Sequence, residues 1–139
     1  MKPQRPQRSE TFPSTSQHPL PKHRILVVDD TQASGRMLAM LLQTLGQEVE
    51  LRFDGASALE AAMSLLPALI FLDIAMPDMS GYDVAQQLRA NPLTRHVVLV
   101  AVTGFGQEGD RQRAFEAGFD YHIVKPASLD ALKRIIGEL

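Results

Sequence analysis

The sequence predicts an α/β fold: a doubly wound, five-stranded parallel sheet flanked by five helices. Three apolar runs, at residues 25–28, 68–72 and 97–102, are each the length of one buried strand. Amphipathic stretches with helical spacing separate these runs. Continuously apolar strands that alternate with helices are typical of a parallel sheet covered on both faces, with right-handed crossovers.

Two helices and an exposed strand are expected after the first buried strand. Apolar residues recur at helical spacing over residues 37–45, and Gly46 is expected to end that helix. Residues 48–51 alternate between charged and apolar types, which predicts a more exposed strand. Ser57 followed by Glu60 resembles a capping box, so a second helix is expected to open there and run to about residue 66.

The rest of the chain repeats the strand–helix pattern three times. The expected elements are a strand over 68–72, a helix opened by Ser80, a strand over 97–102, a polar helix over 107–117 closed by Gly118, a strand over 121–124 and a helix capped by Ser128. One face of that last helix is expected to pack on the sheet through Leu129, Leu132, Ile135 and Ile136.

Length and composition fit one globular domain without disulfides. The chain has 139 residues, 14 Lys and Arg, 16 Asp and Glu, and no Cys, which excludes disulfides, thiolate metal sites and a Cys nucleophile. The net charge of −2 gives no electrostatic footprint for nucleic acid. No apolar run approaches the roughly 18 residues of a membrane span. We therefore expect a cytoplasmic protein that binds neither nucleic acid nor membrane.

The amino-terminal segment differs from the rest of the chain. Residues 1–24 hold five basic residues, one acidic residue and five of the nine prolines. Such a segment buries too little apolar surface to offset the entropy of ordering it. We expect a disordered Pro-rich tail or linker over residues 1–22 and a folded domain over 23–139. The tail is either a tether or basic contact arm, or it has no role of its own.

The residues that follow the predicted strands are unusual. Four of the five strands end in an ionisable or hydroxyl group, and the residues concerned are Asp29, Asp30, Asp73, Thr103 and Lys125. In open parallel α/β sheets, the functional site lies beyond the carboxyl ends of the strands. We therefore expect these side chains to form one site.

The chemistry of this set points to phosphoryl transfer. Crowded carboxylates repel one another, and a hard divalent cation such as Mg²⁺ relieves that repulsion. Lys125 adds a positive charge suited to phosphate, and Thr103 adds a hydroxyl donor for a phosphoryl oxygen. An Asp held beside a metal and a Lys can attack phosphorus and form an aspartyl phosphate. Each residue alone also fits an ordinary loop, cap or surface position, so the prediction depends on the whole set.

Four stretches carry a family resemblance: ILVVDD at 25–30, LDIAMPDMSG at 72–81, AVTG at 101–104 and VKP at 124–126. Together they resemble the receiver domain of bacterial two-component response regulators, over about residues 24–139. The resemblance implies a flavodoxin-like, CheY-like fold with strand order 2-1-3-4-5. It also implies phosphorylation by a histidine kinase or a histidine phosphotransfer domain.

The resemblance also implies which residues bind the metal and the phosphoryl group. Asp73 would accept the phosphoryl group. Asp30 and Asp73 would bind Mg²⁺ (or Mn²⁺) directly, Asp29 would bind it through water, and the third protein ligand would be the backbone carbonyl of Ala75. Lys125 would pair with the Asp73 carboxylate and then with the phosphoryl group.

A conformational switch is implied as well. Thr103 would move to bond the phosphoryl group, and a ring three residues before Lys125 would rotate into the space that it leaves. That ring is His122 here, not the commoner Tyr or Phe, which would make the switch sensitive to pH near neutrality; alternatively, His122 is an ordinary half-exposed strand residue. The surface that changes would be the fourth helix, fifth strand and fifth helix, as a shift between two packings.

Two further residues bear on the lifetime of the phosphoryl group. Ala75 has no polar side chain to orient an attacking water, and Phe105 is bulky enough to cover the phosphoryl group. We therefore expect slow self-dephosphorylation.

The extent and assembly of the whole protein stay open. The chain is either a stand-alone regulator or part of a longer protein, because residues 103–107 and 117–122 are similar to receivers of hybrid histidine kinases. A homodimer through the switching surface and an unidentified downstream protein are further expectations.

Two other classes of function are less well supported. A receiver-like interaction module that is never phosphorylated usually lacks the acceptor Asp, an acidic residue or the Lys, and this chain has all of them. A haloacid-dehalogenase-type phosphatase needs an Asp-x-Asp arrangement after the first strand, and a flavodoxin needs a first loop rich in Ser, Thr and Gly. Adjacent Asp29 and Asp30 fit neither. We expect a phosphorylation switch, not an enzyme that turns over free substrates.

Overall fold

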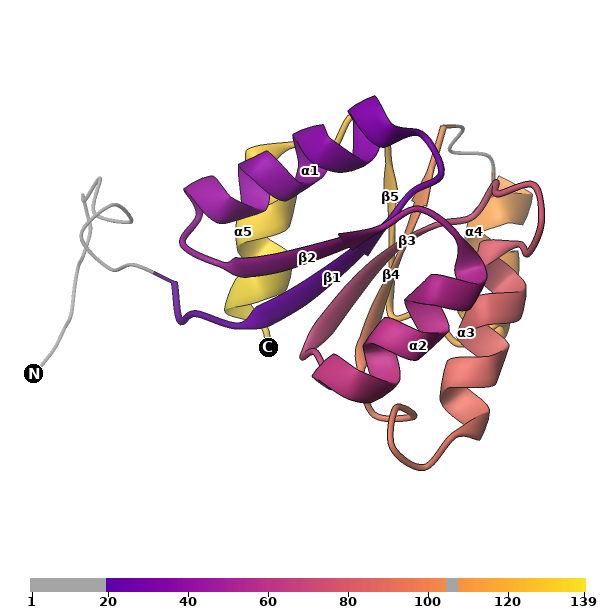
Figure 1. Ribbon diagram of the computed structural model, residues 1–139. Helices are drawn as coiled ribbons and strands as arrows, with labels where there is room; N and C mark the ends of the chain where they lie inside the picture. Colours follow the sequence, from indigo (N-terminus) through magenta and orange to yellow (C-terminus); the bar gives the residue numbers. More distant parts are fainter. Residues whose placement is uncertain (1–19, 105–107) are drawn as a thin grey trace, which may run out of the picture.

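A computed structural model describes residues 20–104 and 108–139, with side chains described for all of these except 108–110. The strands are β1 (Arg24–Val28), β2 (Glu48–Arg52), β3 (Leu69–Asp73), β4 (Val98–Thr103) and β5 (Tyr121–Val124). The helices are α1 (Gln32–Thr44), α2 (Gly55–Leu65), α3 (Gly81–Ala90), α4 (Glu108–Glu116) and α5 (Leu129–Gly137). All strand pairs are parallel in the order β2-β1-β3-β4-β5, which confirms the predicted fold class and strand order (Figure 1).

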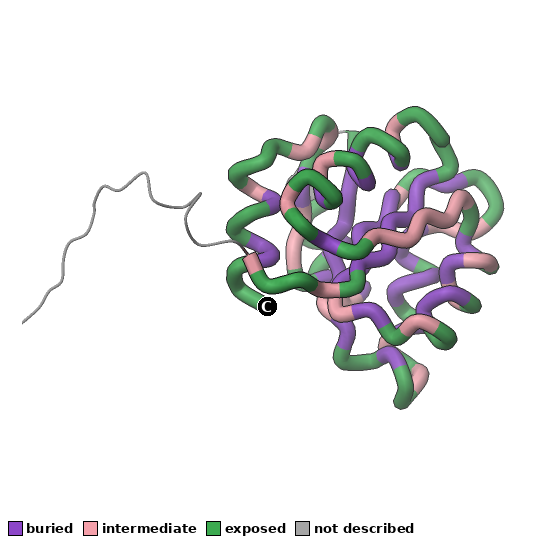
Figure 2. The backbone as a smooth tube through the Cα atoms, turned by 60° about the vertical axis from the view of Figure 1, so that its left-hand side comes forward, coloured by how far each residue is buried: buried purple, intermediate pink, exposed green. Residues whose placement is uncertain are grey.

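The helices cover both faces of the sheet and enclose two separate cores. On one face α1 and α5 pack against alternate strand residues such as Val27 and Phe71. On the other face α2, α3 and α4 pack against the intervening residues, such as Leu26 and Leu72. Because both sets are buried, the central strands are apolar except at the ends, where Arg24, Asp73 and Thr103 lie. These strands form the buried centre of the molecule in Figure 2.

The start of α2 differs from the prediction. Asp54, not Ser57, is the N-cap residue, and its Oδ1 accepts a hydrogen bond of 2.8 Å from the Ser57 backbone N–H. Ser57 therefore lies inside the first turn. A carboxylate at this position accepts the same backbone hydrogen bond as a hydroxyl and also interacts favourably with the helix dipole. The predicted caps at Ser80 and Ser128 are confirmed.

The ends of other helices follow the prediction with one exception. Gly46 and Gly118 follow α1 and α4 with φ of +83° and +107°, a conformation that glycine adopts without steric cost. On α5, Leu132 and its neighbours on the same face are buried, but Leu129 is 40% exposed and lies outside the core. The prediction for Leu129 was wrong because this residue is the first of the helix, beyond the stretch that packs on the sheet.

Contacts with the domain begin at the first described residue. Leu20 packs against the core on the α1 and α5 face. The buried Gln47 side chain donates from Nε2 to the Pro21 carbonyl at 3.0 Å and accepts at Oε1 from the His23 backbone N–H at 2.8 Å. These contacts precede residue 23, where the composition places the start of the domain. Within the described ranges, no helix has the length and apolar character that crossing a membrane requires.

Candidate functional site

The carboxyl ends of β1 and β3 bring three carboxylates together. One side-chain oxygen from each of Asp29, Asp30 and Asp73 lies within 4.8 Å of the others. Asp29 and Asp73 are buried, at 4% and 5% exposure, whereas Asp30 is exposed. The cluster therefore consists of two buried carboxylates and one that faces solvent.

Lys125, which follows β5, lies between the two buried carboxylates. Its Nζ is 3.0 Å from Asp29 Oδ2 and 3.3 Å from Asp73 Oδ2. The resemblance implied only the contact with Asp73, and the structure adds the shorter one with Asp29. One ammonium group contacts two of the three carboxylates in this cluster, which leaves an excess of negative charge at this edge of the sheet.

Backbone amides orient both buried carboxylates. Asp73 Oδ1 accepts from the Ala75 N–H at 3.0 Å, and Asp29 Oδ1 accepts from the Thr31 N–H at 2.9 Å. In each case Oδ1 is held by the following loop while Oδ2 faces Lys125. The Asp73 oxygen beside Lys125 is therefore the one that is free of backbone hydrogen bonds among those described.

The two buried carboxylates differ in acidity. Burial raises the pKa of Asp73 to about 6, and the Asp29 charge adds to this rise although the Ala75 amide and Lys125 oppose it. Burial would also raise the pKa of Asp29, but hydrogen bonds from Thr31, Ser34 and Lys125 outweigh it and hold that pKa below its usual value. Burial lowers the pKa of Lys125, and its two carboxylate partners more than compensate, so it stays charged.

The carboxylates suit a hard divalent cation. Mg²⁺ prefers oxygen ligands and uses one or two carboxylates together with water. The Asp29, Asp30 and Asp73 oxygens offer such ligands within a small space, and the excess negative charge favours a cation there. The residues that are present therefore fit Mg²⁺.

Thr103 and His122 lie side by side on neighbouring strands. The Thr103 Oγ1 is 3.4 Å from His122 Nε2, and Thr103 is buried while His122 is half-buried. Thr103 is the last residue of β4, so its hydroxyl is at the same edge of the sheet as the carboxylates. Phe105, the expected phosphoryl shield, lies outside the described residues.

A close backbone contact, which the sequence pattern does not predict, supports the loop after Asp73. A Cβ added to Gly81, the first residue of α3, would lie 2.5 Å from the Asp73 carbonyl oxygen and 2.8 Å from Ile74 Cα. The Gly81 N–H also donates to the Ile74 carbonyl at 3.0 Å. Only glycine fits at this position without displacing the loop that carries Asp73.

Gly81→Ala is accordingly expected to lower the free energy of unfolding by about 1–3 kcal/mol, because the contacting atoms belong to the backbone and cannot move aside. Urea unfolding measures this change. Gly137→Ala is the matched control, since nothing lies within 4 Å of its added Cβ. Equal stabilities of the two variants would show that the backbone at Asp73 and Ile74 leaves room for a Cβ at position 81.

An apolar groove adjoins the charged site. It lies between α1 and the start of the β5–α5 loop, with Met37 and Leu41 on one side and Pro126 and Ala127 on the other. Asp29 and Lys125 also line it, so the groove is continuous with the carboxylate cluster. Met37 is 61% exposed, which leaves this apolar surface accessible to another molecule.

Residues 25–137 match the response regulator receiver domain. The chain belongs to this family. The receiver is 38% identical over 126 residues to the response regulator PleD of Caulobacter vibrioides. That match covers 84% of this chain and 28% of PleD, so the receiver spans just over a quarter of the length of this relative.

Two solved receiver structures are similar as well. The receiver of the sensor histidine kinase PA1611 from Pseudomonas aeruginosa, with a magnesium ion coordinated in its active-site cleft, has a TM-score of 0.78 and 29% identity. This comparison covers 85% of the present chain and 97% of the other. The receiver of Saccharomyces cerevisiae Ssk1, in complex with the histidine phosphotransfer protein Ypd1, has a TM-score of 0.77 and 26% identity, covering 86% and 89%.

Proposed function

We propose that this receiver is a phosphorylation switch in which Asp73 takes a phosphoryl group from a phosphohistidine. The observation that carries the proposal is the environment of the Asp73 carboxylate. It is buried, one oxygen is fixed by the Ala75 amide, and the other faces the Lys125 ammonium at 3.3 Å. That second oxygen is positioned and charge-balanced as a nucleophile should be.

The transfer step uses the chain's own residues as follows. Asp73 Oδ2 attacks phosphorus, a P–O bond forms, and the P–N bond to the donor imidazole breaks. The imidazole leaves with its electron pair and takes up a proton from solvent. Lys125 neutralises negative charge on the phosphoryl oxygens, and the product is an acyl phosphate on Asp73.

Mg²⁺ supplies additional neutralisation of charge when it is bound. Asp30 and Asp73 would hold it directly, Asp29 through water, and the Ala75 carbonyl would be a further ligand. The carboxylate cluster described above supports this set. The magnesium ion in the similar PA1611 receiver supports the choice of metal.

The switch would begin at Thr103. Its hydroxyl turns from His122 toward the phosphoryl oxygens, and the imidazole packs into the space beside β4. The 3.4 Å contact between the two side chains supports this coupling. The change then reaches the surface formed by α4, β5 and α5, where a downstream protein or a second copy of the chain would bind. Phe105 and the apolar side chain of Ala75 would slow hydrolysis of the acyl phosphate.

The phosphodonor would be a histidine kinase or a histidine phosphotransfer domain. The apolar groove beside Lys125 offers such a donor a surface continuous with the site. The similarity to Ssk1, solved with Ypd1, supports this class of partner. We place the reaction in the cytoplasm, on a stand-alone regulator or on a receiver within a longer protein, with residues 1–22 as a tail or linker.

Intact-mass measurement tests the proposal. After incubation with acetyl phosphate and Mg²⁺, the chain should gain one phosphoryl group, and Asp73→Asn should gain none. Asp78→Asn, at an exposed position five residues further on, is the matched control and should be phosphorylated normally. Mg²⁺-independent labelling, or labelling of Asp73→Asn equal to that of the unchanged chain, would contradict the proposal.

The switch should depend on pH through His122. A ring packed beside β4 is desolvated, and desolvation disfavours a charged imidazole. With beryllofluoride in place of the phosphoryl group, the switched population should therefore fall as pH drops from about 8 to about 6. The NMR chemical shifts of the β5 backbone amides measure the switched population at each pH. His122→Phe should abolish the dependence, and a flat profile in the unchanged chain would remove this hypothesis.

A further inference from the structure

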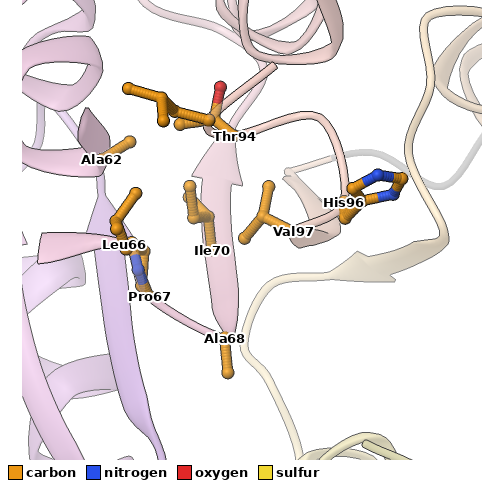
Figure 3. Close-up of a pocket in the computed structure, with 9 residues that line it drawn as sticks. Ala62, Leu66, Pro67, Ala68, Ile70, Thr94, His96 and Val97 are labelled. Atoms are coloured by element: carbon orange, nitrogen blue, oxygen red, sulfur yellow. The ribbon is translucent and has the colours of Figure 1, made fainter. Parts of the chain in front are cut away.

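We propose that a pocket at the amino-terminal edge of the sheet binds an apolar side chain carried by an acidic segment of another protein. The pocket lies where β3 and β4 begin, whereas Asp73 ends β3, so it is at the opposite end of the strand from the carboxylate cluster. Figure 3 shows Ile70 in the middle, with Leu66 and Pro67 on one side and Val97 and His96 on the other.

The size and lining of the pocket suit one large apolar side chain. Its volume is about 230 Å³, and seven of its nine lining residues are apolar. An apolar cavity of about 150 Å³ accommodates a benzene molecule. The Thr94 hydroxyl, a polar group in the wall, already donates to the Leu88 carbonyl at 2.7 Å. The pocket can therefore take a leucine or phenylalanine side chain without leaving that hydroxyl unpaired.

Large apolar side chains surround the opening. Leu66 is 56% exposed and Leu93 is 61% exposed, and both line the pocket. Met63 of α2, at 45% exposure, is outside the lining but contacts the start of the α3–β4 loop, because Asn91 Nδ2 lies 3.5 Å from its sulfur. Single exposed apolar residues are ordinary. Here two lie at one opening, one directly after α2 and one in the α3–β4 loop, and with Met63 nearby they form a patch that a partner can cover.

The backbone at Leu66 gives a second, independent indication. Leu66 follows α2 with φ of +47°, the one non-glycine positive φ among the described residues. Glycine is the usual residue at such a helix end, and leucine there is sterically unfavourable. The exposed Leu66 side chain gains little from the core of this chain in return. A partner that buries the side chain would account for leucine at this position.

The basic residues at the rim determine the character of the partner. Arg95 and His96 are exposed and immediately precede Val97. On the other side, Arg24 Nη1 donates to the Leu65 carbonyl at 3.2 Å, which places a guanidinium group beside Leu66. Arg24 also lies 3.8 Å from Glu48, whereas Arg95 forms no ion pair with any described residue. A partner with carboxylates on either side of its apolar residue complements this rim.

Two other occupants are disfavoured by charge. Residues 1–22 of this chain carry four basic residues and one acidic residue, so the tail would be repelled by the rim. A second copy bound symmetrically would bring two copies of the same basic rim together. The remaining occupant is an acidic segment of a different protein. Because the pocket is at the opposite end of β3, this segment would bind without covering Asp73. Docking should therefore be independent of phosphorylation, and its failure would leave the proposed function untouched.

Amide NMR of the full ¹⁵N-labelled chain tests the docking surface. The probe is the synthetic peptide Asp-Glu-Asp-Leu-Phe-Asp-Glu; one control peptide has Ser for Leu and Phe, and another has Lys for every acidic residue. The acidic apolar peptide should shift resonances of residues 62–70 and 93–97 saturably, and the controls should not.

Leu93→Ser should weaken binding about ten-fold through lost apolar burial. Arg95→Glu should weaken it about five-fold.

Two matched variants complete the design. Leu129→Ser changes an exposed leucine on α5 and should leave peptide binding unchanged. Asp73→Asn should bind the peptide as the unchanged chain does. The proposal is overturned if the acidic peptide shifts no resonances in the pocket, if either control peptide binds equally well, or if the shifts map to the groove beside Lys125 instead.

Discussion

Asp73→Asn should make the metal-free protein more stable at neutral pH while abolishing its proposed activity. Burial, with the Asp29 charge beside it, raises the pKa of Asp73 from 3.8 to about 6. At a pH between these two pKa values, Asp73 is protonated in the folded protein and ionised in the unfolded chain. Raising the pH through this range therefore lowers the free energy of unfolding. The full shift corresponds to about 3 kcal/mol, which is an upper limit for the gain because Lys125 loses one partner.

Urea unfolding in the presence of EDTA measures this effect. The free energy of unfolding of the unchanged chain should carry a component that falls as pH rises from about 4 to about 6 and then levels. Asp73→Asn should lack that component, so the two curves should separate through this window and stay apart above it. Asp78→Asn, at an exposed position, should follow the unchanged chain. Parallel curves for Asp73→Asn and the unchanged chain would show that ionising the buried Asp73 carboxyl group does not destabilise the fold.

Lys125→Met should have the opposite effect. Lys125 Nζ contacts both buried carboxylates, and removing it leaves Asp29 and Asp73 without a cation among the described side chains. Breaking a buried ion pair by removing one partner is strongly destabilising. We expect a loss of about 2–3 kcal/mol in metal-free protein at neutral pH. The loss should shrink at about pH 4, where more of the carboxylates are protonated.

Mg²⁺ should restore most of the stability of Lys125→Met, because it supplies the missing positive charge to the same carboxylates. Thermal unfolding with and without Mg²⁺ measures the recovery. Lys133→Met on the exposed face of α5 is the control, and its stability should change little in either condition. A Lys125→Met variant as stable as the control without metal would mean that the two carboxylates tolerate each other unaided.

Much of the site could be predicted because its residues occupy a topologically defined position. Asp29 and Lys125 come directly after a strand, and Asp73 and Thr103 are the last residues of theirs. The carboxyl ends of parallel strands meet at one edge of the sheet. The residue types at strand ends, read with the apolar runs before them, are local signals. The strand order required the family resemblance, because the apolar pattern alone does not specify which strands are neighbours.

The features that were missed depend on distances between elements. Nothing local shows that Lys125 is nearer to Asp29 than to Asp73, since this depends on how β1, β3 and β5 twist past one another. The close approach of Gly81 to the Asp73 carbonyl is likewise a product of packing. The cap at Asp54 could have been found, because an Asp three residues before Ser57 satisfies the same local rule that Ser57 does.

The most direct test locates the phosphoryl group on the chain. After phosphorylation with acetyl phosphate and Mg²⁺, borohydride reduces an aspartyl phosphate to homoserine, and peptide mass spectrometry identifies the reduced residue. The structure predicts homoserine at position 73 alone, because the Asp73 oxygen beside Lys125 is buried, oriented and free of backbone hydrogen bonds among those described. Homoserine at position 29 or 30, or none in a chain whose intact mass has increased, would contradict the assignment of Asp73 as the phosphoacceptor.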